Sequence, residues 1–417
     1  MEYASSAVLD STRGDDPRRA RRSGPPSRRR TNGSGTVAGR RRDPLWAKLL
    51  VIFGALLMLG SGTLVVGQKL IFAAATGSLN QTSLLDPATQ GQQQHVTIEG
   101  AKNILLVGVD SRPGQNPNDL VRSDSIMIVH IPATHDRAYL VSIPRDTYVD
   151  IPAYNNGKSP YRGGKDKINA AFAFGGQGLT GLQGRQNGFR LLQQTIRTNY
   201  GIDFQAGAIV DFQGFQDVVK VLGGVTMTID EEVKSIHVGT NNRTGKFAAP
   251  ATIDADALPH AVPGVTPKTY PKGCYHLAPW EALDYVRQRD WLANGDGDYG
   301  RTRHQQQFIK AVFKEILTAN VLSDPGKLKS VLAVVGKAMT IDSGQISLED
   351  WIFAMRNVSP GSMMTIKTNG GQFNSKTIPG LGSVEELNPT SLQLLAAVRQ
   401  DAVDGFVQQH TDWVSQS

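Results

Sequence analysis

The sequence predicts a single α/β domain over residues 98–406, in which helices cover both faces of a central mixed sheet, preceded by one transmembrane helix. Two features lead to this prediction. Within 98–406, short β-rich apolar runs alternate with amphipathic helical segments, the pattern of an α-β-α sandwich. Before it, residues 49–67 are 19 residues without a charged side chain. As a helix they would span about one hydrocarbon core of roughly 30 Å.

The positive charge of the chain is confined to its N-terminal end. The chain has 417 residues and a net charge of +7, and residues 1–48 hold 12 of its 44 basic and 5 of its 37 acidic residues. This segment alone accounts for the net charge, so no nucleic acid partner is expected for the folded body. Residues 1–44 are rich in Arg, Ser, Gly and Pro, with few large apolar side chains. We expect them to form a disordered basic cytoplasmic tail.

The transmembrane helix is predicted over residues 45–68, and its uncharged stretch, 49–67, lies between Lys48 and Lys69. Arginines precede it in excess, so the positive-inside rule places the N-terminus in the cytoplasm and the large domain outside the cell membrane. A cleaved signal peptide is the alternative, but the apolar region of such peptides is only about 7–15 residues long. Residues 69–97, rich in Thr, Gln, Ser and Gly, are predicted to be a juxtamembrane linker.

The first half of the domain predicts most strands of the sheet. Three runs are almost continuously apolar, which suits strands that are buried on both faces. Apolar residues at helical spacing, followed by glycine, predict the intervening helices. The expected strands are 104–109, 125–131, 138–143, 206–211 and 225–229, and the expected helices are 187–200 and 212–222.

The second half predicts mainly helices. Residues 234–275 are polar and rich in Gly, Pro and Thr, which predicts a long surface excursion or lid. Cys274 is the only cysteine, so an intramolecular disulfide is excluded, and we expect a buried, inert thiol. The expected helices are 279–286, 301–320, 325–339, 347–358 and 391–406, followed by a flexible C-terminus at 407–417.

Two aspartates stand where predicted strands meet turns. Asp110 directly follows the first strand, where α/β sheets build their ligand crevice, and Asp124 directly precedes the second. If these strands are neighbours, the two carboxylates meet at one edge of the sheet. Hard oxygen ligands without His or Cys suit Mg²⁺ or Mn²⁺, which complete their coordination with water and substrate phosphates. The alternative is that both aspartates are solvated turn caps.

Basic side chains gather at further strand ends and turns. Arg145 ends the third strand, and Lys167 follows downstream. Arg287 and Arg289 are two residues apart, which separates them on a helix but aligns them on an extended segment. Both can serve one site only if the predicted helix ends near Val286.

A helix N-terminus adds an anion-binding feature. Arg301 and Gln305 are four residues apart and face one side of the predicted helix at its start, where the helix dipole favours anions. Further along this face, Phe308 and Val312 are apolar. A phosphate-bearing ligand with an apolar neighbour fits this pattern, and so does an ordinary amphipathic helix.

Six segments, in this order, resemble the motifs of the LytR-CpsA-Psr family, and in particular its actinobacterial members. The resemblance spans about residues 101–320, and the basic tail and single span agree with the layout of that family. It implies a transferase that moves a glycopolymer from a polyprenyl-pyrophosphate carrier to peptidoglycan through a phosphodiester bond. The segments are Asn103–Arg112, Arg122–Met127, Ser142–Thr147, Lys167–Ala170, Tyr285–Arg289 and Asp298–Arg301.

The resemblance also implies roles for individual residues. The metal ligands would be Asp110 and Asp124, which are also predicted to be catalytic, as is Arg289. For the reaction itself we expect Asp298 to be the general base, a role that Asp110 could share. Where the family often has Arg, this chain has His304. Apolar side chains such as Ile128, Phe172, Phe189, Leu192, Phe212 and Phe308 are candidates for a lipid channel, although each individually fits ordinary core better. The implied pyrophosphate-binding residues are Arg122, Arg145, Lys167, Arg287, Arg289, Arg301 and Gln305.

Other functions remain open at this stage. The same pocket suits a polyprenyl-pyrophosphate phosphatase, with water in place of the acceptor. A membrane-anchored regulator and a prenyl-lipid receptor without turnover are the non-enzymatic alternatives. The expected partners are the lipid-linked glycopolymer, peptidoglycan and membrane lipid. The composition suggests a high-GC Gram-positive source, which favours arabinogalactan as the polymer.

Overall fold

The computed structural model describes residues 83–85, 98–109, 121–254, 258–318 and 354–415, with scattered positions between 330 and 351. The predicted tail and transmembrane helix lie outside these residues, as does most of the predicted linker. Within the described part, no helix has the length and apolar sequence needed to cross a membrane.

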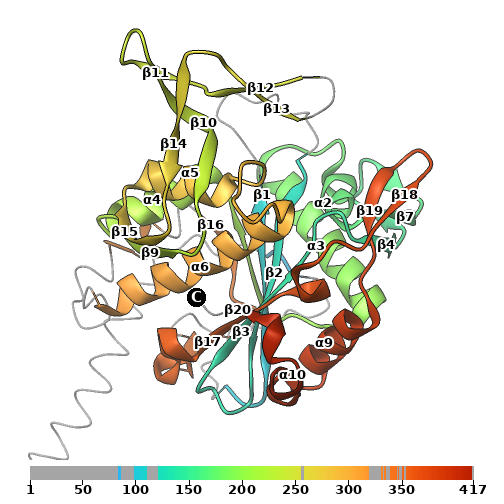
Figure 1. Cartoon of the computed structure of the whole chain (residues 1–417). Coiled ribbons are helices and arrows are strands. Elements are labelled where there is room, and N and C mark those ends of the chain that lie inside the picture. Colours follow the sequence, from blue (N-terminus) through green and yellow to red (C-terminus); the bar gives the residue numbers. More distant parts are fainter. Residues whose placement is uncertain are drawn as a thin grey trace, which may run out of the picture. The chain divides into compact units, whose positions relative to one another are not determined.

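A seven-stranded mixed sheet forms the centre of the domain (Figure 1). Its strand order is β16-β8-β1-β2-β3-β17-β20, with antiparallel pairs in the middle and parallel pairs of β1 with β8 and of β3 with β17. This confirms the prediction of a central mixed sheet. The strands are β1 (Lys102–Val109), β2 (Ser123–Ile131), β3 (Ala138–Ile143), β8 (Ala206–Val210), β16 (Met339–Asp342), β17 (Met363–Ile366) and β20 (Val414–Ser415).

Helices cover both faces of this sheet (Figure 1). On one face, apolar side chains of β1, β2 and β3 pack with α2, α3 and α9 in a single core cluster. On the other face, Ile309 and Phe313 of α6 pack near Met127 and Leu140 of the sheet. The face-covering helices are α2 (Ile168–Gly176), α3 (Gly181–Tyr200), α6 (Gly297–Thr318), α9 (Pro389–Arg399) and α10 (Val403–Gln409).

A second core joins α4 and α5 to a group of peripheral strands. Two of these, β10 and β14, form an antiparallel pair that projects from the body as an arm (Figure 1). Residues 234–275 therefore form a surface excursion as predicted, but it consists largely of paired strands, with Val233 and Tyr270 buried at the foot. The elements are α4 (Phe212–Val221), α5 (Pro279–Arg287), β9 (Val225–Ile229), β10 (Val233–Asn241), β11 (Phe247–Ala248), β12 (Ala251–Ile253), β13 (Pro259–Ala261), β14 (Val265–Tyr270) and β15 (Gly273–Leu277).

The expectation of a buried Cys274 is wrong. Cys274 lies on β15, which pairs only with β9 in a two-stranded ribbon, and its thiol is exposed. A ribbon of two strands leaves much of its surface uncovered, and the neighbouring Tyr275 and His276 are exposed as well.

Several boundaries also differ from expectation. Helix α6 begins at Gly297, four residues before the expected start. The expected helix at 391–406 is two helices, α9 and α10, separated where Asp401 adopts a φ of 54°. The expected helix at 325–339 lies mostly outside the described residues, and Met339 begins strand β16. Of the expected helix at 347–358, the described part includes a short 3₁₀ turn, Met355–Asn357.

The C-terminus is part of the fold rather than a flexible end. Trp413 is buried in the main core, and β20 pairs with β17 at the edge of the sheet, so its backbone completes the hydrogen bonding of that edge. The expected linker also contains packed residues. The backbone N–H groups of Leu84 and Leu85 donate to Asp342 Oδ2 at 2.7 and 2.8 Å, and both side chains are buried.

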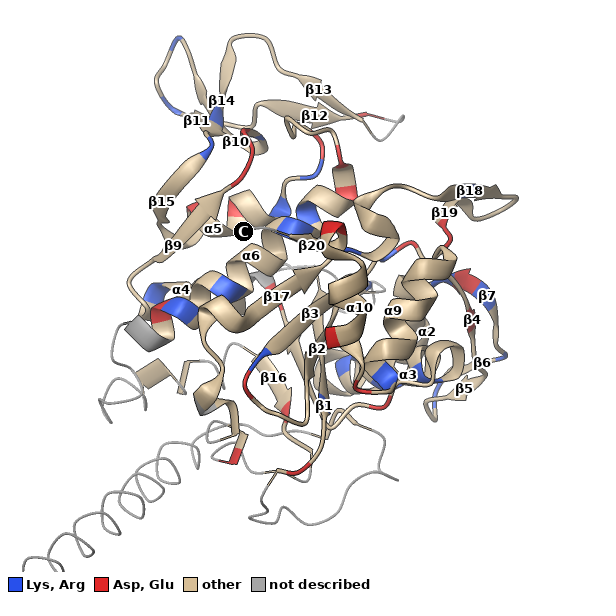
Figure 2. Cartoon of the chain, turned by 60° about the horizontal axis from the view of Figure 1, so that its bottom comes forward, with Lys and Arg blue, Asp and Glu red and all other residues tan. Residues whose placement is uncertain are grey.

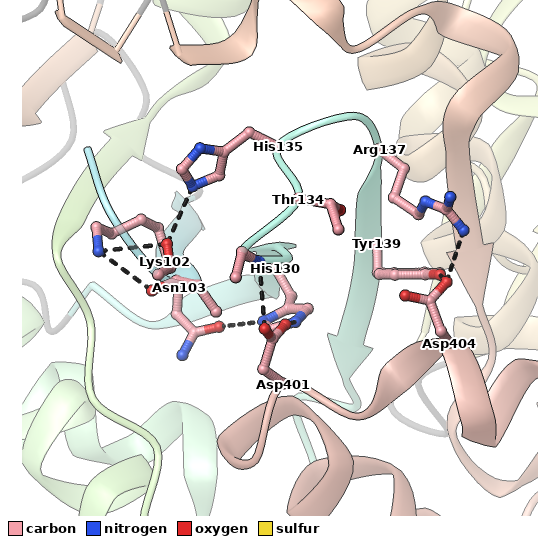
Figure 3. Close-up of polar contacts among 12 residues, drawn as sticks. Lys102, Asn103, His130, Thr134, His135, Arg137, Tyr139, Asp401 and Asp404 are labelled. Atoms are coloured by element: carbon pink, nitrogen blue, oxygen red, sulfur yellow. Dashed lines mark hydrogen bonds and ion pairs between the residues drawn. The ribbon is translucent and has the colours of Figure 1, made fainter. Parts of the chain in front are cut away.

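A polar network ties the C-terminal helices to the sheet (Figure 3). Buried His130 lies between Asn103 Oδ1, at 2.8 Å, and Asp401 Oδ1, at 3.1 Å. Burial lowers the pKa of His130, although Asp401 opposes this effect. Asp404 accepts hydrogen bonds from Tyr139 and, at 2.7 Å, from Arg137. These contacts hold α10 and the turn before it against β1, β2 and β3.

The remaining elements are short ribbons and 3₁₀ turns that the sequence did not predict. They pack around the end of the sheet at which α2 begins and around the C-terminal helices. They are β4 (Tyr148–Ile151), β5 (Tyr154–Asn155), β6 (Pro160–Tyr161), β7 (Gly164–Lys167), β18 (Ser375–Ile378), β19 (Gly382–Glu385), Pro360–Ser362, Thr368–Gly371 and Thr411–Trp413.

The close packing of α2 against α3 generates a stability prediction. A Cβ atom at Gly188 of α3 would lie 2.6 Å from the carbonyl oxygen of Phe172 in α2. We expect Gly188→Ala to lower the free energy of unfolding by about 1–3 kcal/mol, despite the better helix propensity of alanine. The matched control is Gly405→Ala in α10, where nothing lies within 4 Å of the new Cβ atom. Urea denaturation measures the free energy of unfolding of both variants. An increase in this free energy in both variants would contradict the prediction.

Candidate active site

A polar pocket of about 120 Å³ lies between the start of β2, the turn after β3 and the first turn of α6. Acidic and basic segments lie side by side where α6 begins (Figure 2). The residues that close the other side come from β17, from β19 and from the segments around them. The charged residues that line the pocket are Asp124, Arg145, Asp146, Asp298, Arg301, Arg303, Lys367 and Glu385.

Four charged side chains form the centre of this pocket. Arg145 donates from Nη1 to Asp124 Oδ1 at 2.7 Å and from Nε to Asp298 Oδ2 at 3.1 Å. Arg301 Nη2 lies 3.2 Å from Asp298 Oδ1 and donates to the backbone carbonyl of Asp124 at 3.3 Å. These contacts connect β2, the turn after β3 and α6. Four of the predicted site residues therefore meet in one place.

Local backbone geometry positions each of these side chains. Thr147 bonds the carbonyl of Pro144 through both its backbone N–H and its hydroxyl, and the N–H of Asn169 donates to the Arg145 carbonyl. The turn that carries Arg145 is therefore fixed from two sides. Gly297 opens α6 with a φ of 52°, a conformation that glycine adopts without strain. Because α6 begins there, Asp298 and Arg301 lie one helical turn apart.

The electrostatics of the pocket hold Asp298 in its ionised form. Burial alone would raise its pKa, but Arg301, Arg145 and Arg289 together lower it below the usual value. Burial opposes the charge of Arg145, yet Asp298 and Asp124 raise its pKa. A carboxylate with a lowered pKa is a weak proton acceptor at neutral pH. The contacts of Asp298 show that it orients two guanidinium groups, and its role as the general base stays a prediction.

An apolar cavity of about 280 Å³ adjoins the polar pocket, and Ser125 lines both. Its walls come from β1, β2, α4, α5 and α6, and the rings of Phe215 and Phe308 stack with a centroid distance of 3.9 Å. Arg287 and Gln305 line this cavity rather than the polar pocket. The apolar lining residues include Leu106, Val107, Val109, Met127, Val210, Phe215, Val218, Leu283, Val286, Phe308, Ile309 and Val312.

Of the six apolar side chains considered for a lipid channel, Phe308 lies in this cavity. Ile128, Phe172, Phe189 and Leu192 belong to the main core on the other face of the sheet. The side chain of Phe212 lies outside the described residues.

The other predicted site residues lie at varying positions around the centre. Lys167 Nζ lies 3.2 Å from Asp146 Oδ1, which places it at the edge of the pocket. Helix α5 ends at Arg287, and Gln288 is extended. The helix therefore ends one residue after Val286, close to the position at which Arg287 and Arg289 could serve one site. Arg289 is close enough to affect the pKa of Asp298.

Two predicted residues are less well placed by the structure. Arg122 is exposed immediately before β2. Asp110 lies outside the described residues, so the predicted meeting of its carboxylate with that of Asp124 is not tested. Asp124 itself is 32% exposed and uses Oδ1 for Arg145, which leaves it suited to offer oxygen to a hard cation.

Sequence reasoning missed a second charged cluster on α6. Arg303 Nε lies 2.8 Å from Asp230 Oδ2, and its Nη atoms pair with Glu231 and Asp296. Buried His304 lies 3.2 Å from Glu231 Oε1 and stacks on Tyr285. Ligand atoms of Asp230, Glu231 and His304 are close enough for a cation, but the Arg303 guanidinium already pairs with these carboxylates. The sequence signals were His304, at a position where the family often has Arg, and the pair Asp230-Glu231 after a strand.

The pairing of Asp298 generates a stability prediction with a defined pH dependence. Asp298→Asn leaves Arg145 and Arg301 without their shared carboxylate, so we expect a loss of about 1–3 kcal/mol at pH 7. Because the folded-state pKa is lowered, the stabilisation is fully present above about pH 4, the usual Asp value. It is lost as the pH falls through the lower folded-state value. Urea denaturation of wild type and Asp298→Asn at pH 7 and pH 3 measures this stabilisation. The same difference in free energy of unfolding at both pH values would contradict the prediction.

Comparisons with known proteins identify relatives that match most of the chain. The chain is 27% identical over 338 residues to the polyisoprenyl-teichoic acid–peptidoglycan teichoic acid transferase TagU of Oceanobacillus iheyensis, covering 80% of this chain and 88% of TagU. It is 27% identical over 323 residues to the cell wall biosynthesis protein LcpA of Corynebacterium glutamicum, covering 72% of this chain and 55% of LcpA.

Solved structures share the fold. Protein gbs0355 from Streptococcus agalactiae has a TM-score of 0.53 at 22% identity, covering 73% of this chain and 88% of gbs0355. TagT bound to LI-WTA has a TM-score of 0.50 at 22% identity, covering 76% of this chain and 98% of TagT. The LytR_cpsA_psr family model matches residues 72–388, which is most of the chain. The chain therefore belongs to the LytR_cpsA_psr family.

Proposed function

We propose that this protein transfers a cell-wall glycopolymer from a polyprenyl-pyrophosphate carrier to peptidoglycan, in a reaction that depends on a divalent metal ion and releases polyprenyl phosphate. One observation carries the proposal. The arginine-lined polar pocket and the apolar cavity share Ser125 as a wall residue. A ligand with a charged head and a long apolar tail fits this pair of spaces, whereas a fully polar ligand would leave the cavity unused.

The named relatives support the same substrate class. TagU is named as a transferase of teichoic acid from a polyisoprenyl carrier to peptidoglycan, and LcpA is named as a cell wall biosynthesis protein. For the polymer, we propose arabinogalactan, on the composition of the chain alone. Anchoring by the predicted span at 45–68 would hold the domain at the membrane surface that carries the lipid-linked donor.

The clamp for the two phosphates would centre on Arg145 and Arg301. Guanidinium groups suit this role because they stay charged and grip phosphate oxygens with two donors. Both arginines are already oriented by carboxylates. The remaining members of the proposed clamp are Arg122, Lys167, Arg287, Arg289 and Gln305.

We propose Asp124 and Asp110 as the ligands of Mg²⁺ or Mn²⁺. The fit rests on Asp124, a partly exposed carboxylate in a pocket whose other charged groups are arginines and further carboxylates. Oxygen ligands of this kind suit Mg²⁺ better than zinc. When bound, the ion would neutralise negative charge on the pyrophosphate oxygens.

The chain's own residues would bind and orient the reacting groups. An acceptor hydroxyl forms a new bond to the sugar-bearing phosphorus as the bond from that phosphorus to the bridging oxygen breaks. The bridging oxygen leaves with polyprenyl phosphate, and the hydroxyl proton passes to solvent water. Arg145 and Arg301 would stabilise the negative charge that develops on the leaving phosphate. In this proposal Asp298 keeps both guanidinium groups aimed at that position.

Product analysis separates this function from its closest rival. If water rather than a sugar hydroxyl attacked, the protein would be a phosphatase and would release free polymer phosphate whether or not peptidoglycan is present. We expect wild-type protein with peptidoglycan and Mg²⁺ to form polymer-linked peptidoglycan, detected by mass spectrometry of wall fragments. If only free polymer is released, both with and without peptidoglycan, the protein is a hydrolase and the proposed transferase function is wrong. Binding of the donor without any turnover would replace it by a receptor or regulatory role.

Two substitutions test the proposed site residues. We expect Asp124→Asn and Arg289→Ala each to lower kcat/KM for transfer by about 10²–10³, because each removes a group that acts on the charged transition state. The control is Arg197→Ala, which removes an exposed arginine of α3 paired with Asp203, far from the pocket in sequence and structure. Circular dichroism and urea denaturation would establish that all three variants fold. Wild-type activity in both site variants would contradict the assignment.

A further inference from the structure

A groove of about 470 Å³ opens to solvent between α4, α5 and the strands of the arm. Two of its lining residues, Leu283 and Arg287, also line the apolar cavity described above. The groove therefore continues from the candidate active site on the outer side of α5. Its other principal lining residues are Gln216, His237, Phe247 and Trp280.

Two aromatic side chains of this groove are unusually exposed. Phe247 of β11 is 72% exposed, and Trp280 in the first turn of α5 is 47% exposed. Exposed aromatic rings that share one concave surface mark an interaction site more often than chance placement. Lys268 Nζ lies 5.7 Å from the centre of the Trp280 ring and 2.8 Å from Glu281 Oε1. The Trp280 ring is thus held by neighbours on the arm and on its own helix.

The floor of the groove is polar and ordered. Buried Asp284 accepts hydrogen bonds from Ser235, Tyr270 and Gln288. Gln288 Nε2 also lies 3.0 Å from His237 Nδ1, and Gln288 Oε1 accepts from the Ile236 N–H, which fixes the amide orientation. The groove therefore combines aromatic surfaces with hydrogen-bonding side chains held in place from below.

We propose that this groove, which adjoins the apolar cavity, binds a saccharide chain. A sugar ring has an apolar C–H face, which packs on aromatic rings, and hydroxyl groups at its edge, which need donors and acceptors. A prenyl chain would gain nothing from Gln216, His237 and Arg287, whereas a saccharide uses both kinds of surface. Arg287 lines both the groove and the apolar cavity, and it is a member of the proposed phosphate clamp, so a sugar in the groove would contact a residue of that clamp. The inference rests on the proposed function, for which it names a glycan subsite.

The test measures binding of soluble sugars to the full-length protein in nanodiscs by isothermal titration calorimetry. One arm uses a peptidoglycan tetrasaccharide of alternating N-acetylglucosamine and N-acetylmuramic acid, and the other uses an oligosaccharide released from the donor polymer. We expect one of the two to bind, and Trp280→Ala and Phe247→Ala each to weaken that binding by about tenfold. The arm that binds identifies the source of the glycan. Tyr275→Ala is the control, because Tyr275 is 39% exposed on β15 but does not line the groove.

Binding of octaprenyl pyrophosphate to the same samples separates the two proposals. If wild type binds octaprenyl pyrophosphate but neither sugar, or binds a sugar equally well in all variants, the saccharide groove is wrong and the proposed function stands. If wild type binds a sugar through Trp280 and Phe247 but does not bind octaprenyl pyrophosphate, the groove stands and the proposed function fails. A loss of octaprenyl pyrophosphate affinity in Trp280→Ala, without a loss of sugar binding, would identify the occupant as lipid and overturn the inference.

Discussion

Arg145 pairs with two carboxylates that lie far from it in the sequence, Asp124 at 2.7 Å and Asp298 at 3.1 Å. Asp124 begins β2, Arg145 follows β3 and Asp298 opens α6, so these contacts fix the first turn of α6 over one end of the sheet. The length of α6 then forms a wall of the apolar cavity, through Phe308 and Val312. The polar pocket and the cavity adjoin because one helix, placed by one ion-pair network, borders both.

The same network sets a condition on any ligand of the pocket. The guanidinium groups of Arg145 and Arg301 already pair with Asp298, so an incoming phosphate competes with a carboxylate for the same donors. A phosphate group offers more acceptor oxygens and more charge than one carboxylate, whereas a neutral ligand offers neither. The ion pairs therefore hold these side chains in a defined arrangement, and in the proposed function only a strongly anionic group would displace Asp298 from the two guanidinium groups.

Local sequence patterns were enough to predict the central strands and several site residues. The apolar runs at 104–109, 125–131 and 138–143 match β1, β2 and β3, because strands buried on both faces carry a strong local signal. The partner of Arg145 was beyond such reasoning, since Asp298 lies 153 residues away. The edge strand β20 and the exposed Cys274 were missed for the same reason, because each depends on its pairing partner. The strand pairs of the arm were not predicted, because its turns and polar residues weaken the local strand signal.

The central claim is that one ligand spans the arginine pocket and the cavity beyond Ser125. Its most direct test is cross-linking of the full-length protein with an octaprenyl pyrophosphate that carries a photoreactive group on its tail, followed by peptide mass spectrometry. We predict that the label appears on cavity residues such as Phe215, Phe308 and Val312, and that unlabelled octaprenyl pyrophosphate abolishes it. Labelling confined to residues outside this cavity, or labelling that unlabelled ligand does not reduce, would contradict the claim.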